Sequence, residues 1–425
     1  MSLRLALERF AYTLVWLLAT PLLPLRLLWR GRKEAGYLCH WNERLGGGPA
    51  GDGRPIWLHA VSVGEVRASV PLVAKLRAAC PRVPLLLTCM TAAGRATAQT
   101  LFAGEIRVRY LPYDYGWAMR RFLRRARPRL GLILETEIWP NLIRQAARGG
   151  VPTMLVNARL SARSARGYAK FPALTRASLA ALRAVAAQTP DDAERLRSLG
   201  ATDVAVMGNL KFDFTPPAEL IERGRAWRAA WGTRAVLLAA STREGEETLI
   251  LDAFLRCFDA ATLLVLVPRH PQRFAAVARL LRERAVAYVR RSADQRPNAG
   301  TRVVLGDSLG ELYAYYAASD VAFIGGSLLD YGGQNLIEAA ACGTPALVGP
   351  HTRNFSAAVA QAVASGAARQ VATADELMDT AAGLLADRAA RQAMSTAALA
   401  YAQAHRGATD KVWKLLQDRC PDLCR

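Results

Sequence analysis

Short apolar runs of strand length alternate with amphipathic, helix-like stretches along most of the chain. The first series of runs lies at 56–61, 85–89, 107–111, 130–134, 153–156 and 185–188, and the second at 236–240, 263–267, 303–305, 321–324 and 346–348. The runs are rich in Val, Ile and Leu and do not alternate with polar residues, which is typical of parallel strands covered on both faces. The pattern therefore predicts an α/β protein with two doubly wound, Rossmann-like halves.

A polar segment with two adjacent prolines separates the two series. Pro216 and Pro217 break the pattern of residues 212–232 and begin the helix that follows. We therefore predict one domain over 36–215 and a second over 216–425 that includes the carboxyl-terminal helices. Ligands of doubly wound sheets bind beyond the carboxyl ends of the strands, so we expect the two halves to face a cleft that holds two substrates.

The amino terminus carries a membrane signal, and we assign residues 1–35 to an anchor. Residues 10–25 are uncharged, and four cations follow them, at Arg26, Arg30, Arg32 and Lys33. The run is shorter than the ~20 residues of a spanning helix, and Pro21 and Pro24 interrupt it, so a tilted span and a monotopic insertion both stay open. Trp16 and Trp29 near its ends favour the membrane interface over a buried core helix, and the trailing cations predict a cytoplasmic location for the remaining chain.

Composition adds charge to this picture. Fifty-six Lys and Arg residues against 35 Asp and Glu give a net charge of +21, which favours phosphate-bearing partners of several kinds: nucleic acid, an anionic membrane or a phosphorylated substrate. The seven cysteines form no C-x-x-C pair, so the sequence predicts reduced thiols and neither a disulfide framework nor a zinc site. Cys420 and Cys424 lie one helical turn apart near the terminus, where we expect exposed thiols.

Candidate catalytic residues of the first half follow its strands. Glu65 follows the first strand and opens a helix, where it is either a proton acceptor or a first-turn carboxylate favoured by the helix dipole; the local sequence alone slightly favours the second. Glu135 and Glu137 follow the fourth strand, and this pairing beside an aromatic residue and a proline indicates a binding loop. Lys211 is either a cation for a phosphate or a leaving group, or a hinge residue paired with Asp213.

In the second half, loops at strand ends indicate an anion site. Residues 325–340 contain two glycine pairs, which let the backbone approach a phosphate, and a helix predicted to begin near Asn335. Residues 267–271 place a proline and an arginine at another strand end, and 306–311 end a further strand. The chain has no G-x-x-x-x-G-K-[ST] and no G-x-G-x-x-G after the first strand, which disfavours the P-loop and Rossmann dinucleotide sites. The five histidines have no metal-ligand spacing.

Taken together, these motifs resemble one enzyme family over nearly the whole chain. In order, they are HAVSVGE (59–65), YLPYD (110–114), ETEIWPN (135–141), NARLSARS (157–164), GNLKFD (208–213), STREGEE (241–247), LVPRHPQRF (266–274), GDSLGEL (306–312), GGSLLDYGGQNLIEAA (325–340) and GPHTRNF (349–355). The series is similar to the 3-deoxy-D-manno-octulosonic acid (Kdo) transferases of lipopolysaccharide assembly. The resemblance implies a GT-B fold and an inverting transfer of Kdo from CMP-Kdo to a phosphorylated lipid A precursor (lipid IVA). It also implies a place at the cytoplasmic face of the bacterial inner membrane, contact with its lipids, and no metal or other cofactor.

The same resemblance implies roles for individual residues. Glu65 would be the general base, and Glu135 and Lys211 would assist the transition state. The contacts to CMP would come from three segments: Pro268 and Arg269; Leu309, Gly310 and Glu311; and Asn335, Leu336, Ile337 and Glu338. The family pattern GGHNPLEAA reads GGQNLIEAA here, with Gln334 and Leu336 in place of His and Pro, which puts in question any role that the histidine side chain has in the family.

Two other functions remain as alternatives at this stage. One is a GT-B glycosyltransferase that uses a UDP-sugar. The other is a basic, membrane-attached nucleic-acid-binding protein, although the chain carries no recognisable nucleic-acid-binding motif.

Overall fold

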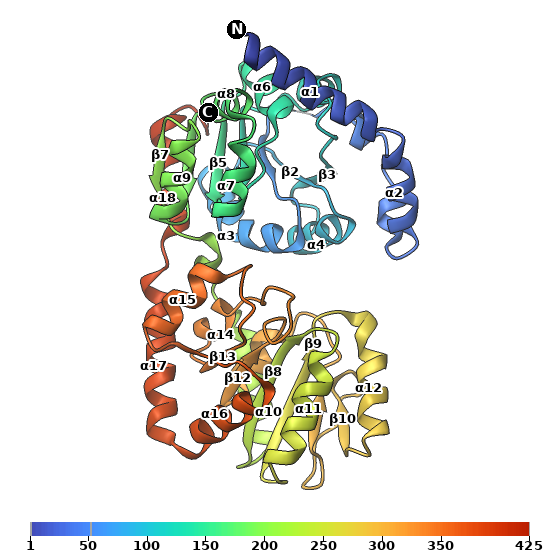
Figure 1. Ribbon diagram of the computed structural model, residues 1–425, viewed down its shortest axis with the longest axis vertical. Helices are drawn as coiled ribbons and strands as arrows, with labels where there is room; N and C mark the ends of the chain where they lie inside the picture. The colour runs from blue at the N-terminus through green and yellow to red at the C-terminus, as the bar shows by residue number, and fades with distance from the viewer. Residues whose placement is uncertain (1, 52, 425) are drawn as a thin grey trace. The chain divides into compact units, whose positions relative to one another are not determined.

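The computed structural model describes residues 2–51 and 53–424, and it divides into two compact units (Figure 1). The first unit comprises Met1–Phe214 together with Arg406–Arg425, and the second comprises Thr215–His405. The sequence prediction, which assigned all of 216–425 to the second domain, therefore differs from the structure at the carboxyl end. The last helix, α18 (Ala408–Arg419), buries Val412 and Leu416 in the core of the first unit, and this burial fixes its place there.

The first unit is built on a seven-stranded, fully parallel sheet of order β3-β2-β1-β4-β5-β6-β7. Its strands are β1 (Ile56–His59), β2 (Leu85–Cys89), β3 (Arg107–Tyr110), β4 (Leu130–Leu134), β5 (Thr153–Ala158), β6 (Ala184–Ala187) and β7 (Val204–Val206). The order reverses between β1 and β4. Loops that leave these two strands flank the switch point, where doubly wound sheets bind ligands.

Helices cover both faces of this sheet. Helices α3, α4 and α18 contribute to the hydrophobic core on one face, and α5, α6, α8 and α9 to the core on the other. Their bounds, with those of α7 and the 3-10 turns, are α3 (Val63–Ala79), α4 (Ala92–Phe102), α5 (Gly116–Ala126), α6 (Pro140–Arg148), α7 (Ala162–Tyr168), α8 (Pro172–Leu179), α9 (Pro190–Ser198), η1 (Ala35–Leu38), η2 (Glu43–Leu45) and η3 (Leu210–Asp213).

The amino-terminal segment forms two helices, α1 (Leu3–Ala19) and α2 (Leu22–Gly31), separated by a 52° bend. Neither helix alone is long and apolar enough to cross a membrane, whereas the bent pair passes that test by length and composition. Apolar side chains project outward along both helices, with Phe10 67%, Leu18 68% and Leu25 61% exposed.

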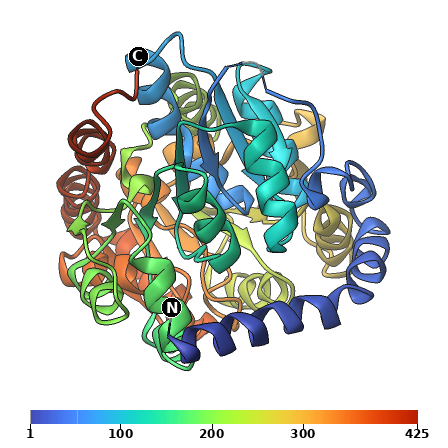
Figure 2. The same cartoon turned by 90° about the horizontal axis from the view of Figure 1, so that it is seen from above.

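The inner side of α1 packs on the first unit, with α8 as one neighbour (Figure 2). The Tyr12 hydroxyl donates to Asp114 Oδ2 at 2.8 Å, and the Thr20 and Tyr115 hydroxyls lie 2.6 Å apart. Trp16 stacks on Trp139, with 6.4 Å between ring centroids. Trp16, which is partly buried, therefore packs against the first unit on one side.

The second unit contains a second fully parallel sheet, of order β10-β11-β9-β8-β12-β13-β14. Its strands are β8 (Ala235–Thr242), β9 (Thr262–Pro268), β10 (Tyr288–Arg290), β11 (Val303–Leu305), β12 (Val321–Ile324), β13 (Ala346–Val348) and β14 (Ala368–Gln370). Its helices are α10 (Ala218–Ala230), α11 (Glu246–Cys257), α12 (Phe274–Glu283), α13 (Leu312–Ala317), α14 (Ile337–Ala341), α15 (Ser356–Ala364), α16 (Ala374–Ala386) and α17 (Arg388–Ala404), with 3-10 turns η4 (Pro271–Arg273) and η5 (Arg291–Ala293). Helices α11, α12, α16 and α17 share one hydrophobic core with the sheet.

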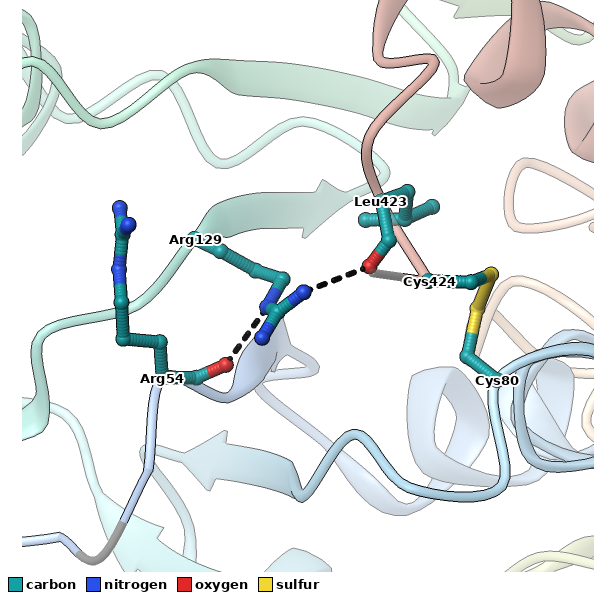
Figure 3. The surroundings of a disulfide bond; sticks show 5 residues. All are labelled: Arg54, Cys80, Arg129, Leu423 and Cys424. Atoms are coloured by element: carbon teal, nitrogen blue, oxygen red, sulfur yellow. Dashed lines mark hydrogen bonds between the residues drawn. A yellow bond between two sulfur atoms is a disulfide. The ribbon is translucent and has the colours of Figure 1, made fainter.

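A disulfide links Cys80 to Cys424, which corrects the prediction that all cysteines are reduced (Figure 3). Cys80 caps α3, and the chain end returns to it after 344 residues, which brings the two Cα atoms to 4.7 Å. Arg129 supports this return, since its guanidinium donates to the carbonyl oxygens of Arg54 and Leu423 at 2.9 and 3.1 Å (Figure 3). A pairing across so long a separation leaves no trace in local cysteine spacing.

Candidate active site

Glu65 lies in the first turn of α3, directly beyond β1, and is 9% exposed. Its side chain turns back over the helix start. Oε2 accepts the Val61 N–H at 2.7 Å, and Oε1 accepts the Ser62 hydroxyl at 3.1 Å. Glu65 thus satisfies backbone and side-chain donors at the helix start, as the capping alternative predicts.

The pKa of Glu65 is higher than that of an ordinary helix-capping carboxylate. Burial, with further contributions from the Glu135 and Glu137 carboxylates, raises the pKa of Glu65 to about 8, against the opposing effect of the Val61 N–H. A carboxyl with a pKa near the working pH can accept a proton from a bound hydroxyl group and release it afterwards. Capping and proton transfer are therefore compatible at this residue.

The structure brings the other two predicted catalytic residues of the first unit into contact. Lys211 Nζ donates to Glu135 Oε1 at 2.9 Å, with side chains only 18% and 14% exposed. Glu135 ends the β4 run in the left-handed region, at φ +58°, a conformation that costs a non-glycine residue about 1 kcal/mol or more. Asp213, the partner that the hinge alternative gives to Lys211, accepts the Gly407 and Thr409 N–H groups at the start of α18.

Three polar side chains that were not predicted as site residues fix the segments around Lys211 and Glu135. Asn157, at the end of β5, accepts the Leu210 N–H at 3.0 Å, and Asn209 accepts the Lys211 N–H at 3.0 Å, so η3 is tied to the sheet. Asp114 accepts the Asn141 and Leu142 N–H groups at 2.9 and 2.8 Å and thereby caps α6. All three residues belong to motifs quoted above, and for Asn157 the polar type at a strand end was the available signal.

Glu137 completes a cluster of carboxylates with Glu65 and Glu135. It accepts the Trp139 Nε1–H, and burial followed by the charge of Glu135 raises its pKa. Burial and the charge of Glu135 both raise the pKa values of Glu65 and Glu137, which disfavours simultaneous ionisation of these two carboxyls. Such a group can hold a proton, or accept one, while Lys211 compensates negative charge that develops nearby.

In the second unit, a buried glutamate organises the glycine loop. Glu246, at the start of α11, is fully buried, and its carboxylate accepts the Gly326, Leu328 and Arg243 N–H groups at 2.6 to 2.9 Å. This residue was missed by sequence reasoning. The loop is further closed by the Gly333 N–H, which donates to the Gly326 carbonyl at 2.6 Å.

Two of the predicted donor-binding segments meet at this loop. Pro268 ends β9, the Arg269 N–H donates to the Thr242 carbonyl at 2.9 Å, and Arg269 Nε donates to Gln334 Oε1 at 3.2 Å. Gln334, the departure from the family pattern, thus bridges the loops that follow β9 and β12.

The segment from Asn335 to Glu338 lies at the start of α14. Asn335 Oδ1 accepts the Ile337 N–H at 3.1 Å, and Glu338 is in the first turn of this five-residue helix, which begins at Ile337 and not at Asn335. Leu336 and Ile337 are buried, at 1% and 2% exposure of the whole residue. Asn335 and Glu338, which are partly exposed, are the accessible residues of this segment.

The third predicted segment follows β11. Leu309 is 67% exposed, and Gly310 adopts a φ of +81° that favours glycine. The Glu311 carboxylate is engaged within the unit, since it accepts from Arg223 and Arg291 at 2.9 Å each. Among the residues that the structure describes, no group of three or more His, Cys, Asp or Glu side chains has an arrangement that could hold a metal ion.

Comparisons with known proteins identify the family. Residues 39–214 match the family model described as 3-deoxy-D-manno-octulosonic-acid transferase (kdotransferase), and residues 283–400 match glycosyl transferases group 1. The 3-deoxy-D-manno-octulosonic acid transferase of Bordetella pertussis is 46% identical over 96% of this chain and 99% of its own length. That of Haemophilus influenzae is 36% identical over 96% of this chain and 98% of its own.

A solved structure supports the fold. Anabaena HepE in complex with UDP has a TM-score of 0.60 at 15% identity, over 86% of this chain and all of that one. Together with the two parallel-sheet α/β units and the group 1 match, this likeness confirms the GT-B-type glycosyltransferase fold. At the identities found over nearly its full length, the chain belongs to the 3-deoxy-D-manno-octulosonic acid (Kdo) transferase family.

Proposed function

We propose that this glycosyltransferase moves Kdo from CMP-Kdo to a hydroxyl group of a phosphorylated lipid A precursor, with Glu65 as the general base. Kdo transfer follows from family membership. The observation that carries the assignment of the base is the buried Glu65 carboxyl beside Glu135 and Glu137, with its pKa raised to about 8.

The chemistry is a single displacement. The acceptor hydroxyl oxygen attacks the anomeric carbon of Kdo, the bond from that carbon to the CMP phosphate oxygen breaks, and CMP departs with the bonding electron pair. The hydroxyl proton passes to Glu65, and the configuration at the anomeric carbon inverts. The Lys211–Glu135 pair would supply the nearby cation that steadies negative charge in the transition state.

In the second unit we propose that the CMP portion contacts Pro268 and Arg269, residues 309–311, and the segment from Asn335 to Glu338. The guanidinium of Arg269 and backbone groups of the glycine loop suit a phosphate. Because fixed cations of the chain can compensate the leaving phosphate, we propose that no divalent ion takes part.

We further propose that the enzyme works at the cytoplasmic face of the inner membrane. The outward apolar side chains of α1 and α2, such as Phe10 and Leu25, would enter the lipid interface, and the net charge of +21 would favour anionic headgroups.

Mass spectrometry of the reaction product tests the proposal. The full chain, incubated with CMP-Kdo and a tetraacyl, bisphosphorylated lipid A precursor, should add Kdo to the lipid in the presence of EDTA. UDP-sugars should give no product, and UDP should compete with CMP-Kdo far less than CMP does. Transfer from a UDP-sugar in place of CMP-Kdo would overturn the donor assignment, and a strict requirement for an added metal would overturn the metal-free chemistry.

A further inference from the structure

Two adjoining cavities lie within the first unit beside α1. The larger, here called the apolar cavity, has a volume of about 480 Å³ and is lined by side chains of α1, α7, α8 and the loop before α6, among them Tyr12, Ile138, Tyr168, Phe171 and Leu174. The smaller, here called the basic cavity, has a volume of about 310 Å³ and includes Arg9, Arg144 and Arg148 in its wall. Both cavities are lined by Pro140, Leu174 and Ser178, so they lie next to each other.

The basic cavity concentrates positive charge. Arg144 and Arg148 stand four residues apart on α6 and therefore on one side of that helix, and Arg9 reaches the same place from α1. Burial lowers the pKa of the Arg144 guanidinium, and the charges of Arg148, Arg9 and Arg120 lower it further.

The carboxylates near this cavity already have partners. The charge of Asp114 raises the pKa of Arg144. The Asp114 carboxylate accepts hydrogen bonds from the Tyr12 hydroxyl and from two backbone N–H groups at the start of α6. Glu8 pairs with Arg4 and accepts the Leu174 N–H at 2.8 Å. A bound anion would relieve the mutual repulsion by which Arg148, Arg9 and Arg120 lower the pKa of Arg144.

The apolar cavity is connected to the candidate catalytic carboxylates by one short loop. Ile138 lines the cavity, and the Tyr168 hydroxyl of its wall donates to the Thr136 carbonyl at 3.3 Å. Thr136 lies between Glu135 and Glu137 in the chain. Burial, followed by the charge of Glu137, raises the pKa of Tyr168 to about 12. A molecule held in the cavity thus rests against the loop that carries the carboxylates.

We infer that these cavities form an acceptor subsite in which the basic cavity binds a phosphoryl group of the acceptor glycolipid and the apolar cavity takes up one of its acyl chains. The inference rests on the proposed function and adds the place of the acceptor. An apolar volume of this size beside a cluster of arginines matches a ligand with both a hydrocarbon chain and a phosphate. Its position against the 135–138 loop favours the acceptor over a bilayer lipid.

Gly167 provides a direct way to fill the apolar cavity. It lines the cavity on α7, and a Cβ atom built there meets no atom within 4 Å, so a leucine is accommodated at the cavity wall without displacing backbone. Gly383, on α16 of the second unit, is equally open and supplies the matched control. Ser164→Leu, also on α7, is a second variant that narrows the same cavity. For the charge, Arg148→Gln is compared with Arg279→Gln, an exposed arginine on α12.

The test measures equilibrium binding of the full chain, in detergent, to three probes: the tetraacyl bisphosphorylated lipid A precursor, its deacylated bisphosphorylated sugar, and its dephosphorylated tetraacyl form. Gly167→Leu and Ser164→Leu should weaken binding of both acylated probes by about tenfold or more and leave the deacylated sugar unchanged. Arg148→Gln should weaken both phosphorylated probes by about fivefold and leave the dephosphorylated lipid unchanged. Gly383→Leu and Arg279→Gln should bind all three as the unmodified chain does.

Each result bears on the inference. Unchanged acceptor binding in the folded cavity variants would overturn it, as would equal losses for all three probes. Equal losses for phosphatidylglycerol vesicles and for the acceptor would also overturn it, because the cavities would then hold bilayer lipid. Product formation by the unmodified chain from CMP-Kdo is scored separately. If that reaction occurs while the variants bind normally, the proposed function stands and only the subsite fails.

Discussion

Replacement of Glu65 by Gln separates its two compatible roles, because it removes the titrating group and keeps an oxygen that can accept the Val61 N–H. As the general base, Glu65 should contribute ~10²–10⁴-fold to turnover. The Glu65→Gln enzyme should therefore lose turnover by that factor, while its affinity for CMP-Kdo, whose proposed contacts lie in the second unit, stays nearly unchanged.

The raised pKa of Glu65 fixes the sign of the pH effects. The folded protein keeps the Glu65 proton up to a pH of about 8, whereas the unfolded chain releases it near 4.5. The contribution of the neutral carboxyl to stability is thus fully present below pH 4.5 and is lost progressively up to about pH 8. The difference in pKa corresponds to about 5 kcal/mol of unfolding free energy over that range. Glu65→Gln should remove this loss, so the variant should gain stability relative to the wild type as the pH rises from 5 to 9.

The activity of the wild type should follow the deprotonated form of Glu65. We expect kcat/KM to rise about tenfold per pH unit below pH 8 and to level off above it. In Glu65→Gln this rise should disappear. Steady-state kinetics from pH 5.5 to 9 and urea unfolding at pH 5 and 9 measure both effects on the same preparations.

The chain offers a matched control for capping. Glu376 also lies in the first turn of a helix, and its Oε2 accepts the N–H of Ala372, four residues earlier, at 2.7 Å, as Glu65 does with Val61. Glu376→Gln should change stability slightly and leave turnover and its pH profile unaltered. If a folded Glu65→Gln enzyme behaved in the same way, with near-normal turnover, the assignment of the base would be refuted.

Three further outcomes follow from the structure. Lys211→Met leaves the buried Glu135 carboxylate without this cation, so urea unfolding should show a loss of about 3 kcal/mol, and addition of Glu135→Gln should recover part of it. Cys424→Ser opens the covalent link to Cys80 and should lower the unfolding free energy by about 2–4 kcal/mol under non-reducing conditions, with no effect after reduction of both proteins. Leu18→Lys on the exposed side of α1 should reduce sedimentation with anionic vesicles while CMP-Kdo affinity stays constant, and unchanged sedimentation would argue against α1 as the contact.

The apolar runs predicted most of both sheets because central parallel strands are buried on two faces. The strands that escaped prediction, β7, β10 and β14, are three-residue edge strands. In each of them at least one residue is exposed. β10 and β14 contain arginine, as an edge strand open to solvent on one side can, so their sequences resemble loops. β7 is apolar throughout, but three residues are too few to give a periodic signal.

Site residues that follow strands could be predicted from the sequence, whereas contacts between residues far apart in the chain could not. Glu65 and Glu135 could be found because they directly follow strands, and the Lys211–Glu135 pair joins residues 76 positions apart. Glu246 escaped notice although it occupies, after β8, a first-turn position like that of Glu65 after β1. Its partners are N–H groups of a loop about 80 residues away, and no local pattern records them.

Backbone strain points to the same edge in both sheets. Among the described residues outside glycine, positive φ angles fall into two main groups. One group, with Ala103 and Arg127, closes helices, where a left-handed residue ends the hydrogen-bonded ladder. The other lies at the carboxyl ends of strands: Glu135 at φ +58°, Asn157 at +53° and Ser241 at +57°. Glycine would adopt these angles at lower cost, and at Glu135 and Asn157 the side chain makes a hydrogen bond that glycine would lose. The Asn157 side chain binds the first residue of η3, and the Glu135 side chain binds Lys211. Ser241 lies near the end of β8, just before Arg243, whose N–H donates to Glu246. Strain retained at the strand ends of both units is consistent with a reaction whose two substrates are bound there.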